Sequence, residues 1–369
     1  DIGGSGFGTG INTAASAYSS ATVTIPLTVD PVNDAPVASG TATLPAVNED
    51  TTSPPGETVA NLFTPTFDDS RDEVAGGSSA NTLAGIAITG NAATAAQGVW
   101  RYSTDGGTTW TTIPTTGLSD TAAIILPSTA RIDFLPTGNW NGTPGGLTVR
   151  LIDGSGTGNA PVAFQASADV SSNGGTTAIS AATVPLTTTV TAVNDAPVVS
   201  GSATVPSSNE DATVPGTAVS TLLGQGTVSY SDTTDDIPSG SSGTPEAGIA
   251  IVGNAATAAQ GAWQYSTDGG TTWNAIPTSG LGDTNAFVLP STAQIRFLAN
   301  ADWNGTPGAL TARISDGTGG LPATGLANLS GDIDGTGQWS AGTITIGTTT
   351  PPVNDAPVAS GTATLPAVN

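Results

Sequence analysis

Short runs of apolar and β-branched residues alternate with turn residues along the chain. Clear runs occupy residues 21–28, 123–126, 147–152 and 183–193, and clusters of Gly, Asn, Asp and Pro separate them. The sequence shows no sustained 3.6-residue period, so the pattern predicts strands rather than helices. Within residues 84–98, residues 91–97 favour a helix, but their small number and the flanking glycines indicate a turn or a single helical turn there.

This strand-rich pattern is repeated in tandem. The motif Val-Asn-Asp-Ala-Pro-Val starts at Val32, Val193 and Val353, and residues 85–110 recur as residues 248–273 with three substitutions. A fixed interval of about 160 residues indicates tandem copies of one domain. We therefore expect the end of one repeat in residues 1–31, complete repeats in 32–192 and 193–352, and the start of another in 353–369. Because residues 358–369 repeat residues 37–48 letter for letter, we expect a window from a longer array.

Many short strands with turn-rich connections predict an all-β fold. The expected architecture is a series of antiparallel Greek-key β-sandwiches, arranged as an extended array. The repeat is longer than the roughly 100 residues of a seven-stranded sandwich, so we also expect an added hairpin.

Composition excludes most catalytic chemistry. The 369 residues include 29 acidic and 6 basic side chains, for a net charge of -23, and the chain has no His, Cys or Met. All six basic residues are arginines. Nucleophiles activated by His, zinc sites built from Cys or His, and lysine Schiff bases are therefore impossible, and we predict that the chain is not an enzyme. The negative charge disfavours nucleic acid and anionic lipid, and no apolar run is long enough for membrane insertion.

Acidic residues recur at matching positions of the two repeats. The clusters are Asn48-Glu49-Asp50 with Asp69, Asp72 and Glu73, and Asn209-Glu210-Asp211 with Asp232, Asp235 and Asp236. Carboxylates this close repel one another, and Ca²⁺, which accepts six to eight oxygen ligands, would relieve that repulsion. A solvated acidic loop is the alternative. Recurrence in both copies, without any lysine to pair, favours the metal.

Several motifs occur in a fixed order in each repeat. Asn-Glu-Asp is followed by an aromatic residue with an Asp cluster, by Trp-Asn-Gly-Thr at Trp140 and Trp303, by Asp-Gly at Asp153 and Asp316, and by Val-Asn-Asp-Ala-Pro-Val. Over nearly the whole chain this order resembles the cadherin-like repeats (VCBS or Val-Asn-Asp-Ala-Pro type) of giant bacterial surface adhesins of the RTX or biofilm-associated type. The resemblance implies sandwiches of the cadherin or immunoglobulin kind with calcium at the joints between them. It also implies cell adhesion and biofilm formation, and a location at the bacterial cell surface or in the biofilm matrix.

The resemblance also implies a set of calcium ligands. They are Asn33, Asp34, Glu49, Asp69 and Asp72 at one joint, and Asn194, Asp195, Glu210, Asp232 and Asp235 at the next. Weaker candidates are Asp50, Glu73, Asp153, Asp211, Asp236 and Asp316. A turn before a hairpin is the alternative role for Asp153 and Asp316. Asp30 is replaced by Thr191 and Pro351 at the equivalent positions, so an acidic ligand is not required there.

A second motif, Ser-x-Asp-x-Gly-x-Thr-Trp, contains Asp105 in one repeat and Asp268 in the other. It resembles the Asp-box of sialidases and other β-propellers, where it forms a hairpin turn rather than a catalytic centre. Propeller blades repeat at about 40 to 50 residues, which does not match this chain. We therefore predict that Asp105 and Asp268 are structural turn residues. We expect the recurring tryptophans in the core, and turns at Asn141-Gly-Thr and Asn304-Gly-Thr rather than glycosylation.

These observations favour a structural role. The leading hypothesis is a stalk or extender of a large secreted adhesin or surface fibre, stiffened by calcium. Its partners would be neighbouring repeats, other copies alongside, and cell surfaces or matrix bound through domains outside this segment. A glycan- or protein-binding sandwich module is the main alternative, which an exposed aromatic patch would favour. A self-assembling matrix filament or surface layer, built through exposed edge strands, is a further variant.

Overall fold

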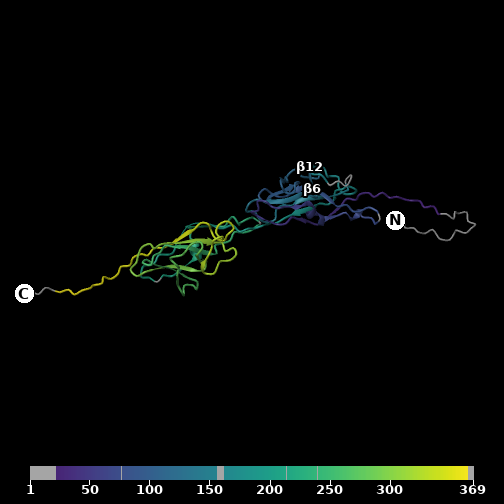
Figure 1. Ribbon diagram of the computed structural model, residues 1–369. Coiled ribbons are helices and arrows are strands. Elements are labelled where there is room, and N and C mark those ends of the chain that lie inside the picture. Colours follow the sequence, from purple (N-terminus) through teal and green to yellow (C-terminus); the bar gives the residue numbers. More distant parts are fainter. Residues whose placement is uncertain (1–21, 76, 156–161, 213, 239, 365–369) are drawn as a thin grey trace, which may run out of the picture.

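The computed structural model describes residues 22–364 except residues 76, 156–161, 213 and 239. Figure 1 shows two strand-rich units placed end to end along the chain. They correspond to the first repeat (residues 32–192) and the second repeat (residues 193–352). The fold is all-β, as the sequence predicts.

In the first repeat, two main sheets stack into a sandwich. Among its described residues, one sheet has the strand order β4-β10-β7-β8 and the other has the order β12-β9-β6-β11-β13-β2, while β1-β5 and β3-β14 form short pairs. The strands are β1 (Val37–Ala38), β2 (Ala42–Thr43), β3 (Val47–Asn48), β4 (Glu57–Thr58), β5 (Phe67–Asp68), β6 (Leu83–Asn91), β7 (Gly98–Ser103), β8 (Thr111–Thr112), β9 (Ala123–Pro127), β10 (Arg131–Pro136), β11 (Leu147–Asp153), β12 (Gln165–Ala168), β13 (Val184–Thr187) and β14 (Val190–Thr191). Short helices α1 (Val59–Phe63), η1 (Thr64–Thr66) and η2 (Ser70–Asp72) connect them.

The second repeat has the same plan. Its described sheets run β16-β22-β19-β20 and β17-β15-β25-β23-β18-β21-β24. The elements are β15 (Val198–Thr204), β16 (Thr217–Ala218), α2 (Val219–Leu223), β17 (Val228–Ser231), β18 (Gly248–Asn254), β19 (Gly261–Ser266), β20 (Asn274–Ala275), β21 (Ala286–Pro290), β22 (Gln294–Ala299), β23 (Leu310–Ser315), β24 (Gly325–Ala327) and β25 (Ile344–Gly347). One long strand, β15, takes the place of both β1 and β2. It pairs with β17 as β1 pairs with β5, and with β25 as β2 pairs with β13.

A tryptophan fills the centre of each sandwich. Trp100 and Trp263 are fully buried, and their indole N–H groups donate to the carbonyl oxygens of Gly145 and Gly308, both at 2.8 Å. Each ring also meets a phenylalanine edge-on, as Trp100 does with Phe134 at 5.1 Å between ring centroids. The rest of each core is mainly Ile and Leu with some Ala and Val, and the large rings are buried with their N–H groups paired.

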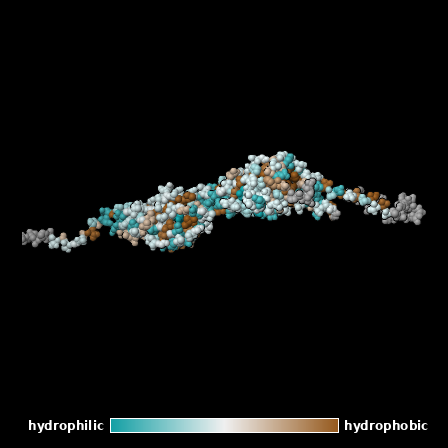
Figure 2. Space-filling view, turned by 45° about the horizontal axis from the view of Figure 1, so that its top comes forward, coloured by the Kyte–Doolittle hydropathy of each residue, from teal (hydrophilic) through white to brown (hydrophobic). Residues whose placement is uncertain are grey.

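The added length of the repeat covers the outer face of the larger sheet. In the first repeat Val170, from the segment between β11 and β13, packs with Ala87 and Ile125 of that sheet. In the second repeat Leu329 and Trp339 do the same. The inserted segment therefore builds a second, smaller core. Figure 2 shows hydrophobic residues gathered in patches on the visible face of each unit.

Most of the expected strands are present. Residues 123–126 and 147–152 lie in β9 and β11, and residues 183–193 contain β13 and β14. In the helix-favouring stretch, residues 95–97 form a turn between β6 and β7. The strand predicted at 21–28 is wrong over its described part, residues 22–28, where Val23, Ile25 and Leu27 are 85 to 87% exposed. Residue 21 lies outside the described residues. An alternating pattern forms a strand only beside a partner strand, and no described strand lies beside this segment.

Not every strand pair is antiparallel. Within the described sheets β2 runs parallel to β13, β3 runs parallel to β14, and β15 runs parallel to β25. The first strands of each repeat thus pair in parallel with its last strands. In the first repeat this pairing places the residues after β3 at the end of the domain where the chain leaves for the next repeat. Among the described residues, no helix has the length and apolar character that a membrane span requires.

Candidate metal centre

The first repeat contributes Glu49 to its own exit. Glu49 directly follows β3, and β3 is parallel to β14, so Glu49 reaches the segment that leaves β14. Its carboxylate accepts a bond from the Val193 N–H at 2.6 Å and one from Asn141 Nδ2 at 2.8 Å. Glu49 is only 2% exposed. A buried acid from the first repeat is therefore fixed against the linker to the second.

The second repeat brings its acids to the same linker. Asp195 N donates to Asp235 Oδ1 at 3.1 Å, and Asn194 Nδ2 donates to Asp316 Oδ2 at 3.1 Å. Asp232 directly follows β17 and accepts the Thr244 N–H at 2.6 Å. We call the set formed by Glu49, Asn194, Asp195, Asp232, Asp235 and Asp316 the central joint.

Electrostatics shows that acids from both repeats face one another there. Burial raises the pKa of Asp195, and the carboxylates of Asp50, Glu49 and Asp232 raise it further. Burial also raises the pKa of Asp235, to about 6, with Asp232, Asp195 and Glu49 adding to the shift against the Asp195 N–H, which lowers it. The pKa of Asp232 is raised by burial and by Asp316. No arginine is among the groups that shift these three pKa values, so no neighbouring positive charge offsets the repulsion among the acids.

Some of the buried oxygens at the linkers have no hydrogen-bond partner. In the described residues these are Asp195 Oδ2 and Asp232 Oδ1 at the central joint, and Asn33 Oδ1 and Asp69 Oδ1 at the preceding linker. Leaving a buried acceptor unpaired costs about 1–3 kcal/mol. All four are hard oxygen donors, which is the chemistry that Ca²⁺ accepts. Within the described residues, no three acidic side chains are drawn together into a coordination shell.

The entrance of the first repeat repeats this arrangement. Asp34 N donates to Asp72 Oδ1 at 2.8 Å, and Asn33 Nδ2 lies 3.5 Å from Asp153 Oδ2. The pKa of Asp69 is raised by burial and then by the carboxylates of Asp153 and Asp72. The structure therefore brings Asn33, Asp34, Asp69 and Asp72 together as grouped from the sequence, and adds Asp153.

The position of the glutamate corrects the predicted grouping. Glu49 does not join Asp69 and Asp72 at the entrance of its repeat, because the parallel pairing of β3 with β14 carries it to the exit. Glu210 likewise leaves the central joint, where it was expected, and accepts the Val353 N–H at 2.7 Å. The central joint thus combines the glutamate of the first repeat with the aspartates of the second.

The weaker candidates divide into three groups. Asp153 and Asp316 are buried, at 1 and 4% exposure, and each contacts a linker asparagine. Asp50 lies near Asp195, and Asp211 lies near Asp355, since each raises its neighbour's pKa. Glu73 and Asp236 are exposed, and among the described hydrogen bonds neither side chain meets a linker. Asp153 and Asp316 therefore belong with the main ligand candidates by position.

The Asp-box residues form hairpin turns in both repeats. Asp105 Oδ1 accepts the N–H groups of Thr108 and Thr109 at 3.1 and 2.9 Å, and Asp105 Oδ2 accepts the Thr109 hydroxyl at 2.6 Å. These bonds lower the pKa of Asp105, led by the Thr109 hydroxyl. Asp268 makes the matching contacts with Thr271 and Thr272.

Asn141 is the joint residue that sequence reasoning missed. It is 3% exposed, and both of its side-chain N–H protons are used, toward Glu49 and toward Ser241 of the second repeat. The recurrence of Trp-Asn-Gly-Thr was the available signal, and it indicated only a turn. A glycan on this nitrogen would break both contacts.

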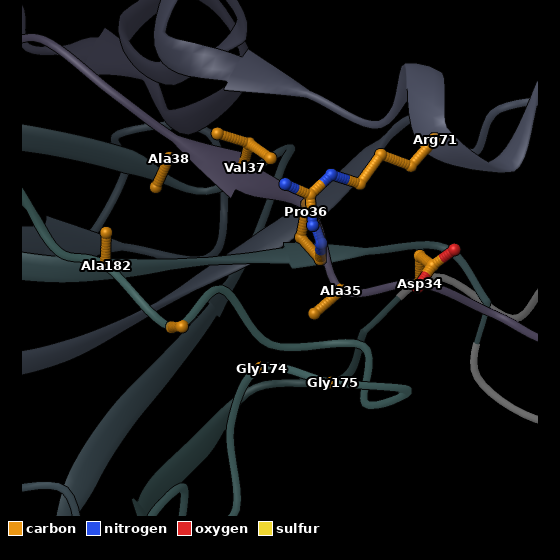
Figure 3. Close-up of a pocket in the computed structure, with 10 residues that line it drawn as sticks. Asp34, Ala35, Pro36, Val37, Ala38, Arg71, Gly174, Gly175 and Ala182 are labelled. Atoms are coloured by element: carbon orange, nitrogen blue, oxygen red, sulfur yellow. The ribbon is translucent and has the colours of Figure 1, made fainter.

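A shallow pocket flanks the first linker. It has a volume of about 240 Å³ and is lined mainly by Ala, Gly, Pro and Val, with Arg71 on one side. Figure 3 shows the Arg71 side chain reaching across toward Pro36. The position that aligns with Arg71 in the second repeat is Thr234, so the arginine of this pocket is not a shared feature of the repeats.

Comparisons with known proteins find similar solved structures but no matching family. No family model and no curated protein matches it. Among solved structures, human CDH23 EC21-23 matches over 84% of this chain and 67% of that chain, with 12% identity and a TM-score of 0.31. Extracellular cadherin domains 1–5 of protocadherin gamma B2 match over 89% of this chain and 42% of that chain, with 14% identity and a TM-score of 0.35.

Proposed function

We propose that this chain is a structural extender of a secreted bacterial surface adhesin or surface fibre, in which Ca²⁺ at each joint fixes the angle between successive sandwiches. One observation carries the proposal. Buried carboxylates from two consecutive repeats face each other across the linker, and two of their oxygens, Asp195 Oδ2 and Asp232 Oδ1, have no partner. The recurrence of the asparagine and aspartates of this set at the entrance of the first repeat supports a role that is repeated along an array.

The central joint offers oxygen ligands from both sides. Glu49 would hold the ion from the first repeat, and Asp195, Asp232 and Asp235 would hold it from the second. Asn194 and Asp316 lie against each other beside them. When bound, Ca²⁺ supplies the positive charge that these acids lack. Because the ligands come from two domains, neutralising them fixes one domain against the other, and their repulsion opposes closure in the metal-free protein.

This chemistry favours an extracellular setting. Calcium sites in extracellular modules commonly have dissociation constants of about 10⁻⁴ to 10⁻³ M, so extracellular calcium fills them and cytosolic calcium does not. The array would therefore stiffen after secretion, since binding to the closed joint shifts its equilibrium. Adhesion and biofilm formation would then depend on binding domains outside this segment, held away from the cell by the array.

Calorimetric titration of calcium into the metal-free chain tests this function. We expect saturable binding that includes an ion at the central joint. Glu49→Gln should remove that ion, because its carboxylate belongs to the central joint. Glu210→Gln is the matched control, since Glu210 lies at the next linker and should leave the central ion in place. Absence of calcium binding to the parent chain would overturn the proposal.

A further inference from the structure

The Asn141 side chain bridges the two repeats by itself. Its Oδ1 accepts the Ser241 N–H at 2.7 Å, and its Nδ2 donates to Ser241 Oγ at 2.8 Å. The second Nδ2 proton goes to Glu49 at 2.8 Å. Both amide protons and one acceptor position are therefore satisfied in a site that is almost fully buried. The two bonds to Ser241 join neutral groups and need no metal ion.

The receiving loop is shaped by the second repeat alone. Ile237 N donates to Ser241 O at 3.0 Å, Gly240 N donates to Ile237 O at 2.9 Å, and Ser241 Oγ donates to Asp235 O at 2.6 Å. Gly240 lies directly against the neighbouring repeat. A Cβ at this position would come within 2.4 Å of Asn141 Oδ1 and 2.8 Å of Asn141 O. The absence of a side chain at Gly240 is what admits Asn141.

We propose that Asn141 of the first repeat and Ile237, Gly240 and Ser241 of the second form a metal-independent clasp, which keeps a fraction of the joints closed when no cation is bound. The clasp also holds Glu49 in place, because the same amide group donates to both Glu49 and Ser241. It opposes the repulsion among the acids of the central joint. This goes beyond the calcium function, since the clasp acts in the chelated protein.

Both halves of the clasp are present in each repeat. Asn304 of the second repeat donates to Glu210 Oε2 at 3.1 Å, as Asn141 does to Glu49. The first repeat carries the matching loop, in which Val74 N donates to Ser78 O at 3.0 Å and Gly77 N donates to Val74 O at 2.8 Å. Asn304 is exposed, whereas Asn141 is buried under the next repeat. Repeats of this kind can therefore be clasped head to tail.

Distance measurement by pulsed electron resonance tests the clasp. The chain has no cysteine, so Thr116→Cys and Ser279→Cys, both exposed, give one spin label in each repeat. In chelator we expect the labelled parent to show a distinct closed-joint peak. Asn141→Ala should lose this peak in chelator. Asn304→Ala is the matched control and should keep it, because it removes the same amide from the other end of the second repeat.

A second pair of variants approaches the contact from the other side. Gly240→Ala should also lose the peak, since its methyl group would collide with Asn141. Gly77→Ala should keep it, because the nearest contacts of that Cβ are with Val74 at 3.4 Å. Thermal unfolding establishes that both repeats remain folded in each variant. A chelated parent without a distinct peak, or an unchanged peak in either Asn141→Ala or Gly240→Ala, overturns the clasp. Because these measurements are made in chelator, they stand whether or not calcium binds.

Discussion

Buried acids in this chain fall into two kinds. Asp133 is fully buried but lies in the fork of the Arg101 guanidinium, with Nε donating to Oδ1 at 3.0 Å. Asp232 and Asp235 are nearly as buried, at 7 and 8% exposure, yet they are surrounded by other acids. A paired acid is part of the scaffold, whereas an unpaired group of acids is destabilised until its members are protonated or meet a positive charge.

Lowering the pH from about 7 to about 5 should raise the folding stability of the metal-free chain and lower that of the calcium-bound chain. The folded pKa of Asp235 is about 6, against an ordinary value of 3.8. Between these values the folded state holds more protons than the unfolded state, so metal-free stability falls as pH rises through this window. The melting temperature of the metal-free second repeat should be higher near pH 5 than near pH 7. Saturating calcium should reverse this order, because its ligands must be deprotonated.

The control for this pH dependence is Asp235→Asn, which removes the titrating group. Its metal-free melting temperature should vary less over the same range than that of the parent. A parent chain whose metal-free stability rises with pH through this window would contradict the conclusion that folding raises the pKa of Asp235.

Asp268→Ala should lower the melting temperature of the second repeat by a few degrees and leave the number of bound calcium ions unchanged. The carboxylate organises its hairpin by accepting two backbone N–H groups and the Thr272 hydroxyl. Differential scanning calorimetry with a calcium titration measures both quantities. Asp105→Ala should have the same effect on the first repeat only. Loss of an ion in either variant would give the turn residue a metal-binding role.

The sequence pointed to the acids that the structure gathers at the linkers, but not to their grouping. Recurrence and spacing were enough to single out Asp69, Asp72 and their counterparts, because those residues follow one strand and meet the linker of their own repeat. Glu49 could not be placed without knowing that β3 runs parallel to β14. Asn141 could not be recognised either, since its partner Ser241 lies 100 residues further along the chain.

At the level of elements, one stretch of sequence occurs twice and takes two structures. Residues 37–48 form β1, β2 and β3, which pair with β5, β13 and β14. Residues 358–364 have the same letters as residues 37–43, but no strand is described there, and Val358 is 92% exposed. Residues 365–369 lie outside the described residues. Strand formation here depends on the partner strands, which is why pattern alone predicted the strand at residues 21–28 wrongly.

Arg313→Gln should destabilise the second repeat by about 1–3 kcal/mol, because the lost bonds involve a charged donor. The guanidinium on β23 donates to both carboxylate oxygens of Asp283, at 2.8 and 3.0 Å, and to the Ser340 carbonyl at 2.7 Å. It thereby ties β23 to the segments before β21 and β25. Chemical denaturation measures the change. Arg150→Gln should act equally on the first repeat, where Asp120 and Ser180 are the partners. An unchanged free energy of unfolding in both variants would show that these arginine contacts do not stabilise the repeats.

On the scale of the whole molecule, a domain and the joint that follows it recur together along the chain. The sequence was sufficient to predict sandwiches in series, because both the repeat interval and the strand pattern can be recognised in it. It also indicated where charge gathers. It left open how one domain contacts the next. In the structure Glu49 of the first repeat accepts the Val193 N–H, and Asn141 of the first repeat bonds to Ser241 of the second.

Small-angle X-ray scattering of the chain, with and without calcium, tests the central claim most directly. If calcium at the joint fixes the angle between sandwiches, saturation should yield the profile of a single extended particle, with a larger maximum dimension than in the metal-free protein. Chelation should restore an average over open and closed joints, and Glu49→Gln should resemble the chelated parent even in calcium. Superimposable profiles with and without bound calcium would contradict the account.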